Sequence, residues 1–398
     1  MKESLFSKLK RIRPGDVGQF FLFLLALLPA AVFRRRRPHL WLLCEYAREA
    51  QDNGFALFRY LRTAHPEVDA VYAIRRDAKD FAKVAALGPT VPYGSFRHWI
   101  YYLAAEVNVS SQKGGKPNAA VCYLLEVVLG WLRTKRVFLQ HGVIKDDLPY
   151  LHCDQAKLAL FCTSAQPEYE FVRDTFGYPE GVVRLLGLCR FDAYRDAAPD
   201  PKLVLILPTW RMWLERDCKT AEAFCASEYY RGWDALLNEP ALDALLERTG
   251  MRAIFCVHRN VARFETCFAS RSGRVSVKKW DEVDVPELIA TAAVLVTDFS
   301  SVYMDFAYLK KPVVYYQFDR ETYRKGHLPE GYFDYERDGF GPVTETATGA
   351  IDALCETIGR GCRMAPPYEQ RAERFFPLRD ARCSERTYEA IREICGKR

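Results

Sequence analysis

The chain has 398 residues, of which 49% are hydrophobic and 27% charged, and its formal net charge at pH 7 is +6. This length predicts two domains, and this composition excludes an intrinsically disordered chain. The modest positive charge fits an anionic ligand or a membrane surface, and it gives no reason to expect nucleic acid as a partner.

The 13 cysteines are scattered along the chain, and no two of them form a Cys-x-x-Cys pair. Their odd number and irregular spacing argue against a zinc site and against the disulfide framework of a secreted protein. We therefore predict no metal site, and we expect reduced, mostly buried thiols in a cytosolic protein.

Residues 1–38 differ in composition from the rest of the chain. Val17–Phe33 is apolar apart from Gly18, Gln19 and Pro29, basic residues precede it, and Arg34–Arg37 follow it. The apolar run is shorter than the roughly 20 residues of a bilayer span, and arginines stand where a signal peptide would be cleaved. We expect a membrane-associating hairpin or interfacial helix whose basic residues contact anionic headgroups. A helix buried against the main body and a single-span anchor are the alternatives.

Residues 39–198 alternate between short apolar strands and helices, which predicts a parallel sheet covered on both faces. Helices are expected near Phe55–Leu61, Phe81–Leu87, Phe96–Ala104 and Tyr123–Leu132. The predicted strands are His39–Cys44, Asp69–Ile74, Glu106–Ser110, Arg136–Gln140, Leu158–Cys162 and Val183–Leu186.

The pattern restarts in residues 199–360, after a linker at Ala197–Pro201, and residues 361–398 are predicted to form a charged helical tail. Four strands are expected here, and polar residues follow each of them. Ligands of open α/β sheets bind at the carboxyl ends of the strands, so this edge is a candidate site. Thr209 and Arg211 follow the strand Lys202–Leu207, and His258 follows Met251–Val257. Thr297 and Asp298 follow Ala293–Val296, and Asp319 follows Pro312–Tyr316.

The stretch Thr297–Asp305 is predicted to be the end of a strand, a polar turn and the start of a helix. Ser300 or Ser301 would cap that helix, and its first backbone N–H groups would form an anion site. The alternative is a plain helix cap without a ligand. Asp305 lies four residues after Ser301, on the same helix face, where it either orients the turn or contacts the ligand.

In the first half, His141 and Gly142 follow a predicted strand directly. An imidazole in such a turn can act as a general base at neutral pH, although a structural histidine bonded to the backbone fits the position equally well. Lys145, three residues further on, is expected to be a solvated surface charge.

In the second half, Arg211 and His258 are expected at the same sheet edge as Thr297, Ser300 and Ser301. Together these residues predict a clamp for a phosphate or diphosphate. The sequence has no Gly-x-Gly-x-x-Gly and no Walker-type lysine loop, which argues against a nicotinamide enzyme and a P-loop kinase. No Asp-x-Asp stands at a strand end, so a metal-bound diphosphate is less favoured. Asp298 is expected either to contact the ligand or to hold the turn.

As an ordered set, these motifs make the sequence similar to the CDP-glycerol glycerophosphotransferases, which include teichoic-acid primases and polymerases and related capsule enzymes. The resemblance covers about residues 39–360. Val143-Ile144-Lys145 departs from the Thr-Pro-Leu of many members, and His258-Arg259 departs from the usual His-Pro. The matching motifs are Ala50–Gly54, Gln140–Gly142 with Lys145, Pro208–Arg211, Val257-His258, Thr297–Phe306, Lys311–Asp319, Gly331–Tyr335 and Gly339–Pro342.

The resemblance implies an α/β fold with two Rossmann-like domains of the glycosyltransferase B type. The acceptor-side domain would be residues 39–198 and the CDP-donor domain residues 199–360. It also implies a place at the cytoplasmic face of the cell membrane, peripheral or monotopic through residues 1–38. The partners would be a CDP-linked polyol donor and a lipid-linked or polymeric polyol-phosphate or glycan acceptor. No oligomeric state is predicted.

The predicted reaction moves glycerol phosphate, or a related polyol phosphate, from CDP-glycerol to an acceptor hydroxyl and releases CMP, with no cofactor required. His141 would take the hydroxyl proton, and His258 would stabilise the charge that develops. Thr297, Asp298, Ser300, Ser301 and Arg211 would bind the donor phosphates, supported by Gly142, Lys145, Thr209 and Asp305. The alternatives are a nucleotide-sugar glycosyltransferase of the same fold and a membrane-bound scaffold that has lost the chemistry.

Overall fold

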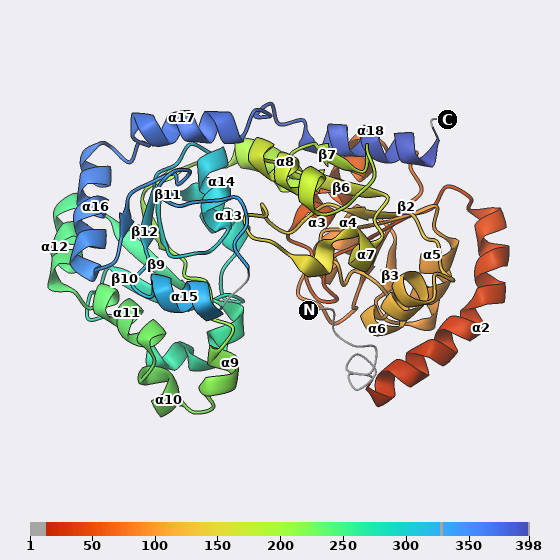
Figure 1. The fold of residues 1–398 in the computed structure, drawn as a ribbon, viewed down its shortest axis with the longest axis horizontal. Coiled ribbons are helices and arrows are strands. Elements are labelled where there is room, and N and C mark those ends of the chain that lie inside the picture. The colour runs from red at the N-terminus through yellow and green to blue at the C-terminus, as the bar shows by residue number, and fades with distance from the viewer. Residues whose placement is uncertain (1–12, 327–328, 397–398) are drawn as a thin grey trace.

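Two α/β domains lie side by side in the computed structural model, which describes residues 13–326 and 329–396 (Figure 1). Each domain is built on one all-parallel sheet with helices on its faces. Inner strands such as β1 (Trp41–Cys44) and β11 (Ala292–Thr297) are almost continuous apolar runs, as expected where a parallel sheet is buried on both faces. The predicted fold of the glycosyltransferase B type, with two Rossmann-like domains, is confirmed.

The first sheet has seven strands in the order β3-β2-β1-β4-β5-β6-β7. Its short edge strand β3 was not among the predicted strands. The strands are β1 (Trp41–Cys44), β2 (Ala70–Ile74), β3 (Thr90–Pro92), β4 (Val107–Ser110), β5 (Arg136–Phe138), β6 (Leu160–Thr163) and β7 (Val183–Leu185). The helices are α3 (Asn53–Ala64), α4 (Phe81–Leu87), α5 (Phe96–Ala104), α6 (Ala119–Tyr123), α7 (Cys153–Ala156) and α8 (Gln166–Thr175).

The helix predicted at Tyr123–Leu132 begins and ends earlier than expected. Asn118 caps α6, since its side chain accepts a hydrogen bond from the backbone N–H of Val121. A π-helical turn, Leu124–Val128, then continues α6, and Gly130 in the left-handed region follows it. The cap at Asn118 and the glycine at 130 therefore set the true limits of this segment.

The second sheet has six strands in the order β10-β9-β8-β11-β12-β13, and its outer strands β10 and β13 were not predicted. The strands are β8 (Asp200–Ile206), β9 (Arg252–Val257), β10 (Val275–Lys279), β11 (Ala292–Thr297), β12 (Val313–Tyr316) and β13 (Val343–Thr344). The helices are α9 (Leu214–Asp217), α10 (Ala221–Cys225), α11 (Glu228–Leu237), α12 (Pro240–Thr249), α13 (Val285–Thr291), α14 (Val302–Tyr308), α15 (Arg320–Gly326) and α16 (Ala347–Gly359).

The chain crosses between the domains twice (Figure 1). A 3₁₀ segment, η3 (Cys189–Asp196), leads from the first sheet to the second. After α17 (Pro366–Phe375), helix α18 (Cys383–Cys395) returns to the first domain, where Ile391 is part of the hydrophobic core. Asp192 joins the two crossings, because its carboxylate accepts hydrogen bonds from the backbone N–H groups of Cys383 and Ser384 at 2.9 and 2.7 Å.

Helix α2 (Pro14–Arg36) is one continuous helix, so the predicted hairpin is wrong for the described residues, and Pro29 lies within the helix without ending it. One face packs on α5, where Trp99 Nε1 donates to the Gln19 side chain at 2.7 Å. The opposite face exposes Val17, Phe21, Leu24, Leu25, Leu28 and Val32. The alternative of a buried helix is therefore correct for one face only. The basic residues before Arg13 lie outside the described part of the chain.

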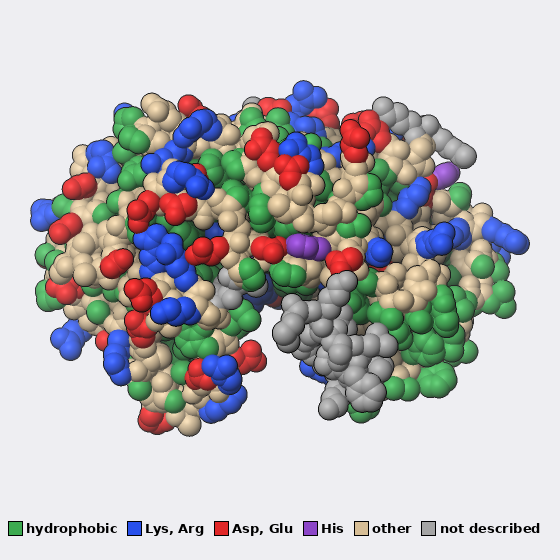
Figure 2. All heavy atoms as spheres, viewed as in Figure 1, with side chains coloured by type: hydrophobic (Ala, Val, Ile, Leu, Met, Phe, Trp, Pro, Cys, Tyr) green, Lys and Arg blue, Asp and Glu red, His purple; other side chains and the backbone are tan. Residues whose placement is uncertain are grey.

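Among the described residues, α2 is the one helix long and apolar enough to cross a membrane. Its most apolar window has a mean hydropathy of 1.9, and 17% of that window is buried. Figure 2 shows hydrophobic side chains gathered at the lower right of the molecule, where α2 and α6 lie in Figure 1.

Candidate active site between the two domains

A cavity of about 480 Å³ lies between the domains. Loops that follow β5, β8 and β11 line it, so it forms where the carboxyl ends of strands from both sheets meet. It brings together five of the predicted site residues from both halves of the chain: His141, Gly142, Lys145, Thr209 and Ser301.

The loop that carries His141 is held by a strained residue and a buried carboxylate. Gln140 adopts a positive φ of 66°, which is unusual for a residue other than glycine. Its amide donates to the carbonyl of Cys162 at 2.7 Å and to the carboxylate of Glu168 at 2.8 Å. Glu168 also accepts from the backbone N–H of Ile144, and burial raises the pKa of this carboxyl to about 7. The loop is thus fixed from both sides of His141.

Asp52, the N-cap residue of α3, makes a 2.7 Å contact from Oδ2 to His141 Nδ1. The His141 side chain is 54% exposed, whereas Asp52 is largely buried. Burial alone would raise the pKa of Asp52, but the charge and hydrogen bond of His141, together with Arg190, lower it below its usual value. An ionised carboxylate can only accept a hydrogen bond, so the proton of the neutral imidazole is on Nδ1 and Nε2 is free to accept.

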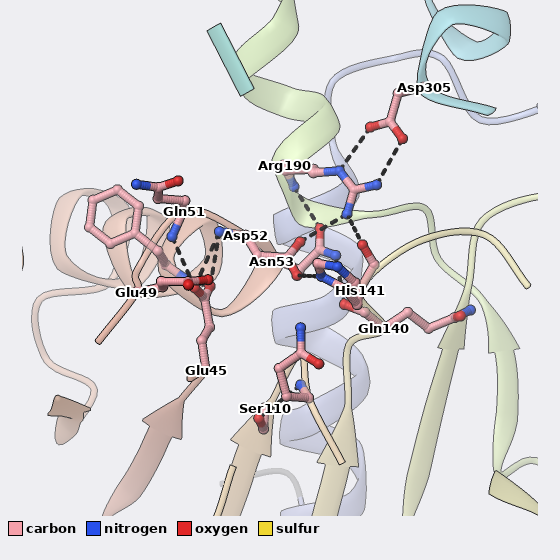
Figure 3. Close-up of polar contacts among 12 residues, drawn as sticks. Glu45, Glu49, Gln51, Asp52, Asn53, Ser110, Gln140, His141, Arg190 and Asp305 are labelled. Atoms are coloured by element: carbon pink, nitrogen blue, oxygen red, sulfur yellow. Dashed lines mark hydrogen bonds and ion pairs between the residues drawn. The ribbon is translucent and has the colours of Figure 1, made fainter. Parts of the chain in front are cut away.

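Arg190, on η3, was not found from the sequence, because nothing in the pattern around it marks a site. Its guanidinium donates to Asp52 Oδ1 at 2.8 Å and to the His141 carbonyl at 2.7 Å. The same guanidinium forms a two-bond ion pair with Asp305 on α14, at 2.8 and 2.9 Å (Figure 3). The carboxylate of Asp305 is buried and also accepts from the hydroxyl of Tyr194. These contacts join Asp305 to Arg190 and Tyr194, and both of its predicted roles, at the turn and at the ligand, stay predictions.

The structure does not bring Arg211 to the cavity, although the sequence predicted that it contacts the donor. Its side chain is completely buried and forms a two-bond ion pair with Asp319 at 2.7 and 2.8 Å. A second ion pair, of 2.9 Å, joins it to Asp298. Since Arg211 is enclosed and already paired with two carboxylates, it stabilises the second domain and does not reach the cavity.

Thr297 and Asp298 belong to this buried cluster too, so neither is placed to bind a donor phosphate directly. The Thr297 hydroxyl donates to the Leu207 carbonyl at 2.6 Å. Asp298 Oδ1 accepts from the backbone N–H groups of Thr209 and Phe299 at 2.8 and 2.6 Å. The cluster thereby fixes the positions of the two loops that carry Thr209 and Ser301 to the cavity.

Ser301 lies at the N-cap position of α14, but its backbone is helical and its hydroxyl makes no capping hydrogen bond, so the predicted cap is wrong. Ser300 is buried. Ser301 instead faces the His141 loop, since a Cβ added to Gly142 would lie 3.1 Å from Ser301 Oγ. Gly142 therefore allows the two domains to approach each other closely at this point.

Lys145 is buried, contrary to the expectation of a solvated charge. Its Nζ pairs with Asp146 at 2.5 Å and lies 6.0 and 5.8 Å from the ring centroids of Tyr323 and Tyr335 in the other domain. Lys145 and Asp146 both line the cavity, so the charge of Lys145 there is partly balanced by its ion pair.

His258 follows β9, and its Nδ1 accepts from the backbone N–H of Asn260 at 3.2 Å. Burial, and then the charges of Arg259 and His141, lower the pKa of His258 to about 3. This side chain is therefore neutral at pH 7, with its proton on Nε2. Its Nε2–H is a hydrogen-bond donor without positive charge, and His258 is not among the residues that line the cavity.

Arg259, which stands where the family usually has proline, makes contacts between the domains. It pairs with Glu49 at 3.2 Å and lies 4.9 Å from the ring centroid of Tyr46, both in the first domain. Tyr46 in turn meets the ring of His141 edge-on, with the centroids 6.5 Å apart.

Within residues 13–326 and 329–396, no group of three or more His, Cys, Asp or Glu side chains could hold a metal ion.

Two parallel α/β domains with a polar cavity between them have the architecture of the glycosyltransferase B fold. A solved structure of the wall teichoic acid polymerase TagF has the same fold, with a TM-score of 0.66 and 16% identity over 95% of this chain and 98% of that chain. The family model for CDP-glycerol:poly(glycerophosphate) glycerophosphotransferase matches residues 27–393. The chain belongs to this family, as the motifs predicted.

Curated relatives agree with this assignment. The minor teichoic acid biosynthesis protein GgaB of Bacillus subtilis (strain 168) is 29% identical over 381 residues, which are 90% of this chain and 40% of GgaB. The teichoic acid glycerol-phosphate transferase of Staphylococcus aureus (strain NCTC 8325 / PS 47) is 32% identical over 28% of each chain. The chain therefore spans about two fifths of the length of GgaB.

Proposed function

We propose that the protein transfers glycerol phosphate, or a related polyol phosphate, from a CDP-linked donor to an acceptor hydroxyl and releases CMP. The product would be a teichoic-acid-like or capsular cell-surface polymer. The family assignment supports the donor, and a TagF structure soaked with CDPG has the same fold. The observation that carries the proposal is the placement of His141, paired with a carboxylate, in the cavity where both sheets end.

In the proposed reaction, the acceptor oxygen attacks the phosphorus that carries glycerol while His141 Nε2 removes the hydroxyl proton. The bond between this phosphorus and the bridging oxygen breaks, and CMP leaves with the electron pair of that bond. Lys145, Ser301, Thr209 and the Nε2–H of His258 would stabilise the negative charge on the phosphates. Apart from the donor, this mechanism requires no cofactor.

We expect the purified full-length chain to release CMP from CDP-glycerol when a lipid-linked or polymeric glycerol-phosphate acceptor is present. Parallel reactions with CDP-ribitol and UDP-glucose test the donor, and each released nucleotide is identified by chromatography. UDP release from UDP-glucose, with no CMP from either CDP-linked donor, would establish the nucleotide-sugar alternative. No nucleotide from any donor would favour the scaffold.

We also propose that α2 holds the protein at the cytoplasmic face of the membrane, peripherally or as a monotopic protein. The helix packs along α5 through one face, while its other face is apolar and exposed. Such a helix lies in the membrane interface with its exposed face among the acyl chains. The exposed Arg35 and Arg36 at its end would contact anionic headgroups. This placement would bring the protein to a lipid-linked acceptor.

Replacing Leu25 and Leu28 with glutamate should lower binding to anionic phospholipid vesicles at least tenfold, as measured by cosedimentation. These side chains are 66% and 76% exposed, and burying a leucine in an apolar phase contributes about 1.5–3 kcal/mol. The matched control is Met212→Glu, which changes an exposed apolar side chain of the second domain and should leave vesicle binding unchanged. Equal binding of the double variant and the wild type would show that α2 is not the membrane contact.

A further inference from the structure

The short motif Ala50–Gly54 contacts the His141 loop through the side chains of Asp52 and Asn53. Asn53 Nδ2 donates to the Gln140 carbonyl at 2.8 Å, and Asn53 Oδ1 accepts from the backbone N–H of Arg190 at 3.0 Å. Asp52 contacts the His141 ring. The motif thus joins the histidine loop to the crossing η3 through side chains of two successive residues (Figure 3).

Asp52 is itself held in place by a second, fully buried carboxyl group, that of Glu45, whose pKa is raised to about 8 by burial and by the charge of Asp52. Glu45 accepts from the backbone N–H groups of Gln51, Asp52 and Phe55 at 2.9, 3.1 and 2.7 Å. Gly54 leaves room for it, since a Cβ there would lie 2.9 Å from Glu45 Cγ. The Asp52 carboxylate therefore has little freedom to move away from His141.

Two carboxylates and one guanidinium lie in contact with one another beside the His141 ring. Asp52 and Asp305 carry two negative charges, and the Arg190 guanidinium between them carries one positive charge. These three side chains together carry one net negative charge. An imidazolium formed when His141 takes the acceptor proton would therefore be attracted to Asp52, because opposite charges attract strongly in a partly buried site.

From this geometry we propose that Asp52 is a positioning residue, which keeps the proton of the neutral His141 ring on Nδ1 and pairs with the imidazolium formed in the reaction. Arg190 completes the arrangement, because it binds Asp52, the His141 carbonyl and Asp305 of the second domain at once. The site is therefore fully assembled only when α14, which carries Asp305 and begins beside Ser301, is docked against the first domain. This inference rests on the proposed function for its kinetic part only.

The test is Asp52→Asn in the full-length protein, with the ¹⁵N chemical shifts of the His141 ring as the first measurement. We expect the wild type to show the Nδ1–H tautomer and the variant to lose its predominance. In the CMP-release assay, kcat should fall about 10²-fold with little change in the KM for CDP-glycerol, because the donor site is untouched. Asp52→Glu, which keeps a carboxylate, should recover part of the loss.

A double-mutant cycle separates positioning from simple loss of stability. If Asp52 acts through His141, Asp52→Asn should have almost no further effect on kcat in a His141→Gln background. An equal loss of kcat in both backgrounds, or an unchanged tautomer in Asp52→Asn, would overturn the proposal. If the wild type releases no CMP at all, the proposed function fails, while the tautomer measurement still decides the role of Asp52.

His39 and Glu106 offer a matched control pair on the first domain. The His39 side chain is 56% exposed, close to the value for His141, and its Nδ1 lies 3.0 Å from Glu106 Oε2. The pair precedes β1 and β4, at the opposite edge of the sheet from the cavity. Glu106→Gln should alter the ring resonances of His39 alone and leave kcat unchanged.

Discussion

Replacing His141 with glutamine will lower kcat for CMP release by about 10²- to 10⁴-fold, the usual contribution of a general base. Glutamine has a similar size and can still donate a hydrogen bond to Asp52, but its amide cannot take a proton from the acceptor. The replaced ring is about half exposed, so the variant should unfold at nearly the same denaturant concentration as the wild type. The KM for CDP-glycerol should stay close to the wild-type value, because His141 acts on the acceptor.

The control for this experiment is His39→Gln, which removes a histidine of similar exposure that also faces a carboxylate. Its kcat should equal that of the wild type. If His141→Gln is folded and keeps at least a third of the wild-type kcat, another group removes the proton. A large rise in the KM for CDP-glycerol at constant kcat would instead place His141 on the donor.

Some of this site could be predicted from the sequence, because the carboxyl ends of parallel strands lie at one edge of the sheet, independent of the conformation of the loops. His141, Thr209, His258 and Ser301 each follow a short apolar run that forms a buried strand. The two domains followed from the same alternation of strands and helices. Motif spacing thus indicates which residues lie near the cavity, but it does not indicate which of them face it.

The features that the sequence did not predict depend on contacts between distant parts of the chain. Arg211 is buried because Asp319, over a hundred residues later, pairs with it. Arg190 has no signal of its own, since its importance comes from Asp52 and Asp305 on either side. Both faces of α2 are apolar, so no periodicity distinguished the face that packs on α5 from the exposed one. Contacts between residues far apart in the chain leave no pattern in the sequence near either residue, so they could not be predicted from it.

Replacing Arg211 with alanine will lower the free energy of unfolding by about 3–5 kcal/mol, the usual cost of removing one partner from a buried ion pair. Asp298 and Asp319 would remain buried without a counter-charge. Burial already raises the pKa of Asp298, partly offset by Arg211, so the variant should raise this pKa further. The cost of keeping Asp298 ionised therefore grows, and the Arg211 variant should lose more stability at neutral pH than at acidic pH.

Urea denaturation followed by tryptophan fluorescence measures this loss, since Trp210, Trp213 and Trp233 lie in the second domain. The matched control is Arg216→Ala, which breaks an ion pair with Asp217 on the surface and should leave the unfolding midpoint unchanged. If Arg211→Ala keeps the wild-type midpoint but binds CDP-glycerol at least tenfold more weakly, Arg211 is a donor ligand after all. The buried pairing predicts a lower unfolding midpoint and little direct effect on donor binding, because the charge of Arg211 is already balanced by two carboxylates. Arg211 then contributes to the donor site only by fixing the loops of Thr209 and Ser301.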